Sequence, residues 1–300
     1  MTSSGVLAGK RIGVFGKGGS GKSTVVALLA RTLCKSGYEV CVLDADSTNI
    51  GLPQALGLNH PPVPLLDFFG GMVFSGGSVT CPVDDPTPLT DASISLDQLP
   101  GRFQSQNPDG ITLLIAGKIG TQGPGAGCDG PIAKIARDFR VTHDWKSAVT
   151  LIDFKAGFED SARGAITSLD WALVVVDPTV AAVEMAANMR DMVDQMKAGG
   201  LPATRHLENP ELVAIANRLF TDASIKGVVC VMNKIPNEEI ENYLRAELTE
   251  KGLTPIGVIH EDASIALSWL KGLPIDSAKA EGDISQIITE LETAEVANPS

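Results

Sequence analysis

The sequence predicts an α/β fold built on a single doubly wound, mostly parallel sheet with helices on both faces. Apolar runs of strand length alternate along the chain with segments of helical periodicity, which is the pattern of a parallel sheet. The polar motifs directly follow strands, and such sheets bind their ligands at the carboxyl ends of the strands. The 300 residues are 44% hydrophobic and 20% charged, which is ordinary for a globular protein.

The predicted elements follow one another in a regular order. The first strand covers residues 11–15 and leads through a glycine-rich loop into a helix over 22–36. A short helix is predicted around 131–139. The other apolar runs predict further strands at 39–43, 111–116, 148–152, 172–176, 228–232 and, with a weaker pattern, 255–259.

One long segment breaks this alternation. Residues 51–110 are irregular and rich in Gly, Pro, Ser and Asp, and a passive loop of this length is uncommon inside a compact domain. We therefore expect residues 1–300 to form a single domain with an insertion at about 58–110. The insertion would pack on the ligand-binding face or on a partner.

The loop after the first strand carries the most specific motif. Residues 16–24 read Gly-Lys-Gly-Gly-Ser-Gly-Lys-Ser-Thr and match the phosphate-binding pattern G-x-x-x-x-G-K-S/T between a strand and a helix. In such a loop Lys22 reaches the β- and γ-phosphates, and the Ser23 hydroxyl ligates Mg²⁺. The sequence therefore predicts binding of ATP or ADP with Mg²⁺. The residues expected to contact them are Gly18, Gly19, Ser20, Gly21, Lys22, Ser23 and Thr24.

Acidic residues follow two other predicted strands. Asp44 and Asp46 come after the second strand, and a spacing of two in an extended segment points both carboxylates the same way. Asp153 ends an apolar strand and has Gly157 close behind it, which is typical of a second Mg²⁺-binding segment. A strand-ending turn at Asp44 and Asp46, or a helix cap at Asp153, is the alternative.

The second lysine of the loop, Lys17, narrows the class. Gly-Lys-Gly-Gly-x-Gly-Lys-S/T resembles the deviant Walker A loop of the Min/Par/nitrogenase-iron-protein group of ATPases. The resemblance implies a P-loop NTPase that hydrolyses ATP slowly and forms a homodimer when ATP binds. It also implies that Lys17 crosses the dimer interface to the partner's nucleotide, so that Lys17 and Lys22 together neutralise charge during hydrolysis.

The same resemblance implies roles at the strand ends. Asp46 matches the aspartate that orients the attacking water. Asp44 matches the strand-end aspartate beside Mg²⁺, and Asp153 matches the one that holds the Mg²⁺ shell through water. Gly157 matches a glycine whose N–H contacts the γ-phosphate.

The strand at 228–232 runs into Asn233 and Lys234, late in the chain and at the matching place in the strand order. In the resembled family an asparagine here reads the adenine edge through its side-chain amide. Asn233 and Lys234 are therefore candidate nucleotide contacts, and a plain turn is the alternative.

Several segments also resemble the CooC-type ATPases, which are nickel-insertion accessory proteins for carbon monoxide dehydrogenase. Residues 153–164 read Asp-Phe-Lys-Ala-Gly-Phe-Glu-Asp-Ser-Ala-Arg-Gly and resemble the Asp-Thr-Glu-Ala-Gly-x-Glu-His-x-x-Arg-Gly segment of that branch. The stretch 44–57 and the stretch 116–119 leading into 127–128 also fit it. The resemblance implies a maturation or metal-insertion factor with a client metalloenzyme as partner.

The chain departs from these families at several positions. Ser47 stands where many members of the wider family have proline, Lys155 replaces a glutamate of the CooC-type branch, and Asp160 replaces a histidine. CooC-type proteins also bind metal between two subunits through a Cys-x-Cys pair. Here Gly130 takes the place of the second cysteine after Cys128.

This last departure leaves two alternatives for a Ni²⁺ or Zn²⁺ site at a dimer interface. Cys128 meets its symmetry mate in a two-fold dimer and forms a weak soft-metal site, which Asp129 or Cys81 would complete. Alternatively, this chain has lost metal binding and has kept only the ATPase.

Charge and composition restrict the partners. The formal net charge of −12 disfavours non-specific binding to nucleic acid and to anionic membranes. No apolar run is long enough to predict a transmembrane helix, no signal peptide is expected, and the five cysteines lack paired spacing. We therefore expect a cytoplasmic protein without a nucleic-acid or membrane partner.

Three functions fit these observations. The first is a dimeric ATPase that matures a metalloenzyme. The second is a MinD/ParA-type spatial organiser of membrane or DNA, which usually needs a basic surface, whereas residues 282–300 contain four acidic residues and no Lys or Arg. The third is a regulatory ATP-binding partner of another protein, although Lys22, Asp46 and Asp153 are all present for catalysis. The sequence does not identify the client.

Overall fold

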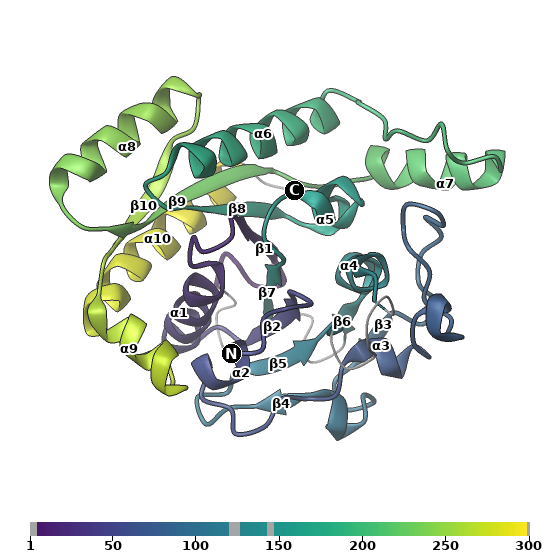
Figure 1. The fold of residues 1–300 in the computed structure, drawn as a ribbon, viewed down its shortest axis with the longest axis horizontal. Coiled ribbons are helices and arrows are strands. Elements are labelled where there is room, and N and C mark those ends of the chain that lie inside the picture. The colour runs from purple at the N-terminus through teal and green to yellow at the C-terminus, as the bar shows by residue number, and fades with distance from the viewer. Residues whose placement is uncertain (1–4, 120–126, 143–146, 299–300) are drawn as a thin grey trace.

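The computed structural model describes residues 5–119, 127–142 and 147–298. Within these ranges an eight-stranded sheet forms the centre of the molecule, in the order β10-β9-β8-β1-β7-β2-β5-β4 (Figure 1). Its strands are β1 (Arg11–Gly16), β2 (Val40–Ala45), β4 (Ser105–Gln106), β5 (Thr112–Ile115), β7 (Val149–Phe154), β8 (Trp171–Val176), β9 (Gly227–Ile235) and β10 (Pro255–His260). A separate parallel pair joins β3 (Ser93–Ser95) to β6 (Arg140–Thr142).

The main sheet is parallel except at one edge. Each neighbouring pair from β10 through β5 is parallel, and the two-residue β4 runs antiparallel to β5. The strand order changes direction beside β1, with β7 and β2 on one side and β8 on the other. The predicted doubly wound α/β fold is therefore confirmed, and the crevice beside such a reversal is where these sheets bind ligands.

Helices cover both faces of this sheet (Figure 1). One face carries α4 (Asp129–Asp138), α6 (Val180–Lys197) and α8 (Glu238–Glu250). The opposite face carries α1 (Lys22–Lys35) and α10 (Ala278–Ala297). The other helical segments are α2 (Leu52–Ala55), α3 (Leu65–Phe68), α5 (Glu159–Ala162), α7 (Pro210–Thr221), α9 (Ala263–Lys271) and the 3-10 turns η1 (Val73–Ser75), η2 (Gly101–Phe103) and η4 (Ala165–Ser168). None of the helices in the described ranges has both the length and the hydrophobicity needed to cross a bilayer.

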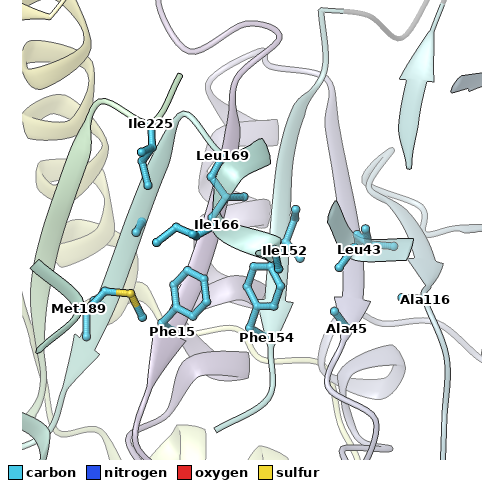
Figure 2. Packing of buried hydrophobic residues seen from close by; sticks show 14 of the residues in the cluster. Phe15, Leu43, Ala45, Ala116, Ile152, Phe154, Ile166, Leu169, Met189 and Ile225 are labelled. Atoms are coloured by element: carbon cyan, nitrogen blue, oxygen red, sulfur yellow. The ribbon is translucent and has the colours of Figure 1, made fainter. Parts of the chain in front are cut away.

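An aromatic stack lies beneath the ends of the two central strands. Phe15 of β1 and Phe154 of β7 are fully buried, with ring centroids 4.5 Å apart and planes 7° from parallel (Figure 2). Burial of each ring contributes about 1.5–3 kcal/mol to folding. Because Phe15 immediately precedes the glycine-rich loop and Phe154 immediately follows Asp153, this stack fixes the point from which both motifs leave the sheet.

Two element boundaries differ from the prediction. β9 runs three residues beyond the predicted strand end, so Asn233 and Lys234 belong to the strand instead of following it. The reason is pairing with β10, in which Asn233 is the register partner of Ile259. α4 begins at Asp129 instead of position 131, because the Cys128 sulfur caps the helix by accepting a hydrogen bond from the Gly130 N–H.

The segment at 58–110 contains short elements of its own. β3 pairs with β6, β4 extends the main sheet, and α3, η1 and η2 lie between them. Leu58 joins the core on the face that carries α1 and α10. Other buried apolar side chains of the segment join the core on the face that carries α4; they are Leu65, Leu66, Met72, Val79, Leu96, Leu99 and Phe103. That this segment is an insertion into a single domain stays a prediction.

A buried carboxylate ties the last helix to the sheet. Glu295 of α10 accepts a hydrogen bond from Trp171 Nε1 of β8 at 2.8 Å and another from Lys226, and it pairs with Lys10 at 2.8 Å. Burial alone would raise the pKa of Glu295, yet the hydrogen bonds from Lys10, Lys226 and Trp171 hold this pKa below its ordinary value. The carboxylate is therefore charged at neutral pH and stabilises the docking of α10.

The substitution Glu295→Gln should lower the free energy of unfolding by about 1–3 kcal/mol at pH 7, because it removes the charge that both lysines face. A carboxylate whose folded pKa lies below its unfolded pKa stabilises the protein above the unfolded value, here about 4.5, and this contribution is lost as pH falls through the folded value. Urea unfolding should therefore separate wild type and variant clearly at pH 7 and only weakly near pH 3. Glu290→Gln, at an exposed site on the same helix, is the control, and an equal loss in both variants at pH 7 would contradict the role given to Glu295.

Candidate functional site

The glycine-rich loop makes a tight connection between β1 and α1. Gly21 has a φ of +95°, and a Cβ at this position would lie 2.3 Å from Nδ2 of Asn233, so a larger residue does not fit. The loop delivers Lys22 and Ser23 to the first turn of α1. The unpaired N–H groups and the positive dipole end at a helix N-terminus favour an anion at this place.

Two residues of β9 hold the loop in position. Asn233 Nδ2 donates to the carbonyl oxygen of Ser20 at 2.7 Å, and Lys234 Nζ donates to the carbonyl oxygen of Gly19, also at 2.7 Å. Lys234 adopts a left-handed φ of +60°, unusual for a residue with a side chain. Asn233 and Lys234 were expected as nucleotide contacts, and the structure adds that they support the loop itself.

Two carboxylates lie side by side next to Ser23. Asp44 of β2 and Asp153 of β7 are register partners in neighbouring strands, and both are fully buried. Ser23 Oγ donates to Asp153 Oδ2 at 2.5 Å. Burial raises the pKa of Asp153 to about 7, with the nearby charge of Asp44 adding to the effect, and burial raises the pKa of Asp44 to about 6. Burial therefore disfavours ionisation of both carboxylates at once, unless a cation offsets their charge.

The surroundings of Asp153 fit a divalent cation. Its Oδ1 is buried and has no hydrogen-bond partner among the described residues. An unpaired buried carboxylate oxygen is costly, and a cation or a cation-bound water would offset that cost. Carboxylate and hydroxyl oxygens are the ligands that Mg²⁺ prefers. The structure thus brings together Ser23, Asp44 and Asp153, the three residues expected to hold Mg²⁺.

Asp46 organises the turn that follows β2. Its Oδ1 accepts hydrogen bonds from the Thr48 N–H at 3.0 Å, the Thr48 hydroxyl at 2.8 Å and the Asn49 N–H at 3.2 Å. Asn49 Nδ2 then donates to Ser23 Oγ at 2.7 Å. Asp46 therefore shapes this turn, and it also lies on the wall of the cavity described below.

Lys118 joins the turn after β2, residues 46–49, to the buried carboxylate of Asp44. Sequence reasoning did not identify it as a site residue. Its Nζ donates to Asp44 Oδ2 at 2.7 Å, to the Asp46 carbonyl oxygen at 2.6 Å and to the Asn49 carbonyl oxygen at 2.5 Å. All three ammonium protons are thereby used within residues 44–49. The sequence signals for it are its position shortly after the end of β5, which lies beside the end of β2, and its place in the stretch 116–119 that fits the CooC-type branch.

Two segments follow strand ends at this site: residues 44–49 at the end of β2, the first strand-end segment, and residues 153–157 at the end of β7, the second strand-end segment. The second lies against the glycine-rich loop. The Gly157 N–H, expected to contact the γ-phosphate, donates to the Gly16 carbonyl oxygen at 3.1 Å. Lys22 is 7% exposed, whereas Lys17 is half-buried. Within the described part of the chain, neither lysine side chain has a recorded hydrogen-bond or ion-pair partner. Gly157 must leave Gly16 before it can bind a phosphate.

Beside these residues lies a cavity of about 740 Å³, which is in the range of small-molecule sites, and Lys22 and Ser23 are among the residues that line it. The glycine-rich loop, Asp46 and Asn233 form one part of its wall. The other part comes from the C-terminal region, including Asp262 and Trp269, which the sequence did not single out. Trp269 Nε1 donates to the Thr24 hydroxyl at 2.9 Å, a contact across 245 positions that no local pattern could reveal.

Cys128 lies apart from this cavity, at the start of α4. Gly130 packs against Cys81, since a Cβ on Gly130 would lie 2.5 Å from Cys81 Sγ. Cys81, considered in the sequence as a possible partner of Cys128, is therefore close to it. In the ranges that the structure describes, however, no group of three or more His, Cys, Asp or Glu side chains could hold a metal ion.

Comparison with known proteins agrees with this geometry. A family model described as the CobQ/CobB/MinD/ParA nucleotide binding domain matches residues 14–275. An uncharacterized ATP-binding protein of Methanocaldococcus jannaschii is 30% identical over 188 residues, which cover 62% of this chain and 74% of that protein. The carbon monoxide dehydrogenase accessory protein CooC of Rhodospirillum rubrum is 28% identical over 200 residues, covering 66% of this chain and 73% of that protein.

Solved structures share the fold. The MinD of the Aquifex aeolicus MinC:MinD cell division protein complex superposes with a TM-score of 0.61 at 19% identity, over 95% of this chain and 96% of that chain. MinD of Pyrococcus horikoshii, solved with Mg-ADP, gives a TM-score of 0.58 at 17% identity, over 97% of this chain and 99% of that chain.

The substitution Lys118→Met should loosen residues 46–51 while leaving the glycine-rich loop in place, because it removes three hydrogen bonds that hold this segment. Amide hydrogen exchange at 48, 49 and 51 should accelerate by about tenfold or more. Lys134→Met is the control: Lys134 is another lysine whose Nζ donates to several groups of one segment, the Thr80 hydroxyl and the Asp85 carbonyl oxygen. That control should accelerate exchange near 80–85 only, and unchanged exchange at 46–51 in Lys118→Met would refute the anchoring role.

Proposed function

The chain belongs to the CobQ/CobB/MinD/ParA nucleotide-binding family, and on that premise we propose that it is a Mg²⁺-dependent ATPase of slow turnover. One observation carries the proposal: Ser23, Asp44 and Asp153 converge beside the phosphate-binding loop, and a buried oxygen of Asp153 has no hydrogen-bond partner among the residues that the structure describes. A divalent cation that binds together with a phosphate ligand would stabilise the buried carboxylates of such a site most. The Mg-ADP in the related Pyrococcus horikoshii structure gives the same ligand pair.

Different residues would bind the phosphates, hold Mg²⁺ and orient the attacking water during hydrolysis. The N–H groups of residues 18–24 and Lys22 bind and orient the phosphates. Bound Mg²⁺ would neutralise charge on the phosphate oxygens, held by Ser23 directly and by Asp44 and Asp153 directly or through water. Asp46 has its Oδ1 occupied by the Thr48 and Asn49 hydrogen bonds, so Oδ2 is the atom that would orient the attacking water. Positioning and charge neutralisation supply most of the acceleration in this chemistry.

The nucleotide base and the ribose would occupy the C-terminal part of the cavity. Asn233 would contact adenine, and its support is that it lines the cavity beside the glycine-rich loop. Lys234 and Thr24 would act with it by holding the loop and α9 in place.

ATP binding would also form a homodimer. Lys17 stands in the loop without a partner in the described residues and carries the signature of the deviant Walker A loop. In the dimer its ammonium would reach the nucleotide of the partner subunit. Release of Gly157 from Gly16 would let the second strand-end segment respond to the γ-phosphate and report the bound state.

The cellular role we favour is a maturation or metal-insertion accessory factor for a client metalloenzyme. Its support is the relative CooC, named for carbon monoxide dehydrogenase, and the resemblance of residues 153–164 to that branch. Cys128 is the residue that would contact Ni²⁺ or Zn²⁺, in the dimer and weakly. The nearby Cys81 supports this, while Gly130 in place of a second cysteine favours loss of metal binding.

A MinD/ParA-type spatial organiser is the second candidate, since the matched family and the related structures include MinD proteins. The net charge of −12 and the acidic residues 282–300 speak against an anionic membrane or DNA as partner. Co-sedimentation with anionic liposomes and with DNA, with and without ATP, distinguishes the two roles.

Steady-state phosphate release tests the ATPase assignment. Lys22→Ala should lose nucleotide binding and turnover, because it removes the cation that faces the phosphates. Asp46→Ala should keep nucleotide binding and lose about 10²–10⁴-fold in turnover, because it removes the group that orients the water. Lys35→Ala, at the far end of the same helix α1, should match the wild type, whereas wild-type rates in Lys22→Ala and Asp46→Ala would show the site assignment to be wrong.

Light scattering with a non-hydrolysable ATP analogue and Mg²⁺ tests the dimer. The wild type should convert from monomer to dimer. Lys17→Ala should bind the analogue with little change in affinity but remain mostly monomeric, because Lys17 would contact only the nucleotide of the partner subunit. Lys271→Ala, at the end of α9, is the control and should dimerise as the wild type does. Lys10 is unsuitable for this purpose because it pairs with Glu295. A wild type that stays monomeric with saturating analogue excludes the proposed switch.

A further inference from the structure

One carboxylate contacts both strand-end segments of the site. Ser47 Oγ donates to Asp129 Oδ1, and Lys155 Nζ donates to Asp129 Oδ2 at 2.6 Å. Ser47 follows Asp46 directly, and Lys155 lies between Asp153 and Gly157. Burial works against the charge of Asp129, yet hydrogen bonds from Lys155 and Ser47 hold its pKa below the ordinary value. Asp129 is therefore an ionised link between two segments that are far apart in the sequence.

The same residue begins the helix that carries a pair of thiols. Asp129 is the first residue of α4, and the preceding Cys128 caps that helix through the Gly130 N–H at 3.4 Å. Cys81 packs onto Gly130 from the segment at 58–110. Cys81 and Cys128 therefore both contact the first turn of α4, and both are half-buried. We refer to these two residues as the thiol pair.

Nucleotide binding must disturb this link if the second segment responds to phosphate. The Gly157 N–H is engaged by the Gly16 carbonyl oxygen, so contact with a γ-phosphate requires residues near 157 to shift. Lys155 lies two residues away and is 35% exposed, so its ammonium can move with the backbone. A shift of Lys155 or Ser47 weakens the hold on Asp129, which is only 15% exposed and keeps its place in the first turn of α4.

We propose that Asp129 is a positioning residue that transmits the nucleotide state of both segments to the thiol pair, which becomes more reactive when Mg-ATP binds. The proposal rests on the proposed ATP binding. Loss of the Lys155 and Ser47 hydrogen bonds frees the first turn of α4, and the thiols that contact this turn become accessible. The thiol pair would thus present a soft nucleophile, suited to a thiol-reactive or soft-metal ligand, only in the ATP-bound state.

Alkylation by N-ethylmaleimide, followed by mass spectrometry of the labelled peptides, measures this reactivity at each cysteine. The sulfur adds to the maleimide double bond, and the thiol proton passes through solvent to the adjacent carbon. Addition of Mg²⁺ and a non-hydrolysable ATP analogue should accelerate labelling of Cys81 and Cys128 about five- to tenfold. Cys34 is the internal reference, because it lies at the end of α1 away from the glycine-rich loop, where its thiol donates to the Asp109 carbonyl oxygen. Its labelling rate should not change with nucleotide.

Variants test whether Asp129 is the route. In Asp129→Asn the thiol pair should label rapidly without nucleotide, and the analogue should change the rate less than twofold. Lys155→Met, which removes only one of the two contacts at a partly exposed site, should reduce the nucleotide effect and covers the case in which Asp129→Asn fails to fold. Glu184→Gln is the matched control, since Glu184 accepts from Lys251 at the same 2.6 Å on the surface, and it should behave as the wild type.

A fluorescent nucleotide measures binding in every variant separately. If the wild type binds the analogue but its thiol pair labels at an equal or lower rate, the inference is wrong while the proposed function stands. If the analogue accelerates labelling in Asp129→Asn and in Lys155→Met as much as in the wild type, Asp129 does not transmit the nucleotide state to the thiol pair. If the wild type binds no nucleotide, the proposed function fails and the inference fails with it.

Discussion

The site depends on two carboxylates that the sheet buries next to each other. Asp44 and Asp153 are register partners at the ends of β2 and β7, so the backbone pairing of the strands fixes their separation. Burial raises the pKa of Asp153 to about 7 and that of Asp44 to about 6, because the sheet removes both carboxylates from water, while the ion pair with Lys118 lowers the pKa of Asp44 in opposition. Such an arrangement reduces stability without a cation, and proteins keep costs of this kind where function requires them.

Compensation of this charge explains the contacts around it. Ser23 donates to Asp153 and brings the first turn of α1 to the carboxylates, while Lys118 donates to Asp44 and fixes the turn that contains Asp46. The Phe15–Phe154 stack packs β1 against β7 next to Asp153, one of the two carboxylates. Each contact that lowers the electrostatic cost therefore also positions a group that a bound nucleotide would use.

The sequence predicted those parts of the site that are encoded locally. The loop at 16–24 is specified by its glycines, and Asp44 and Asp153 are recognisable because each ends or closely follows an apolar strand. Lys118 was not found as a site residue, and Asp129 was considered only as a metal ligand, because their partners Asp44 and Ser47 are 74 and 82 positions away. The extension of β9 through Asn233 was missed for a similar reason, since it depends on pairing with β10. Contacts of this range depend on the sheet order, which hydrophobic periodicity does not contain.

The unusual residues of this chain also become related once the structure is known. Ser47 and Lys155 depart from the patterns of the resembled families at separate places in the sequence, yet both side chains donate to Asp129. Neither proline at 47 nor glutamate at 155 could make these hydrogen bonds, so the two departures support each other through one carboxylate. Gly130, a further departure among the four, leaves the space that Cys81 occupies. Differences that appear independent in the sequence therefore form one connected region, running from the strand ends to the first turn of α4.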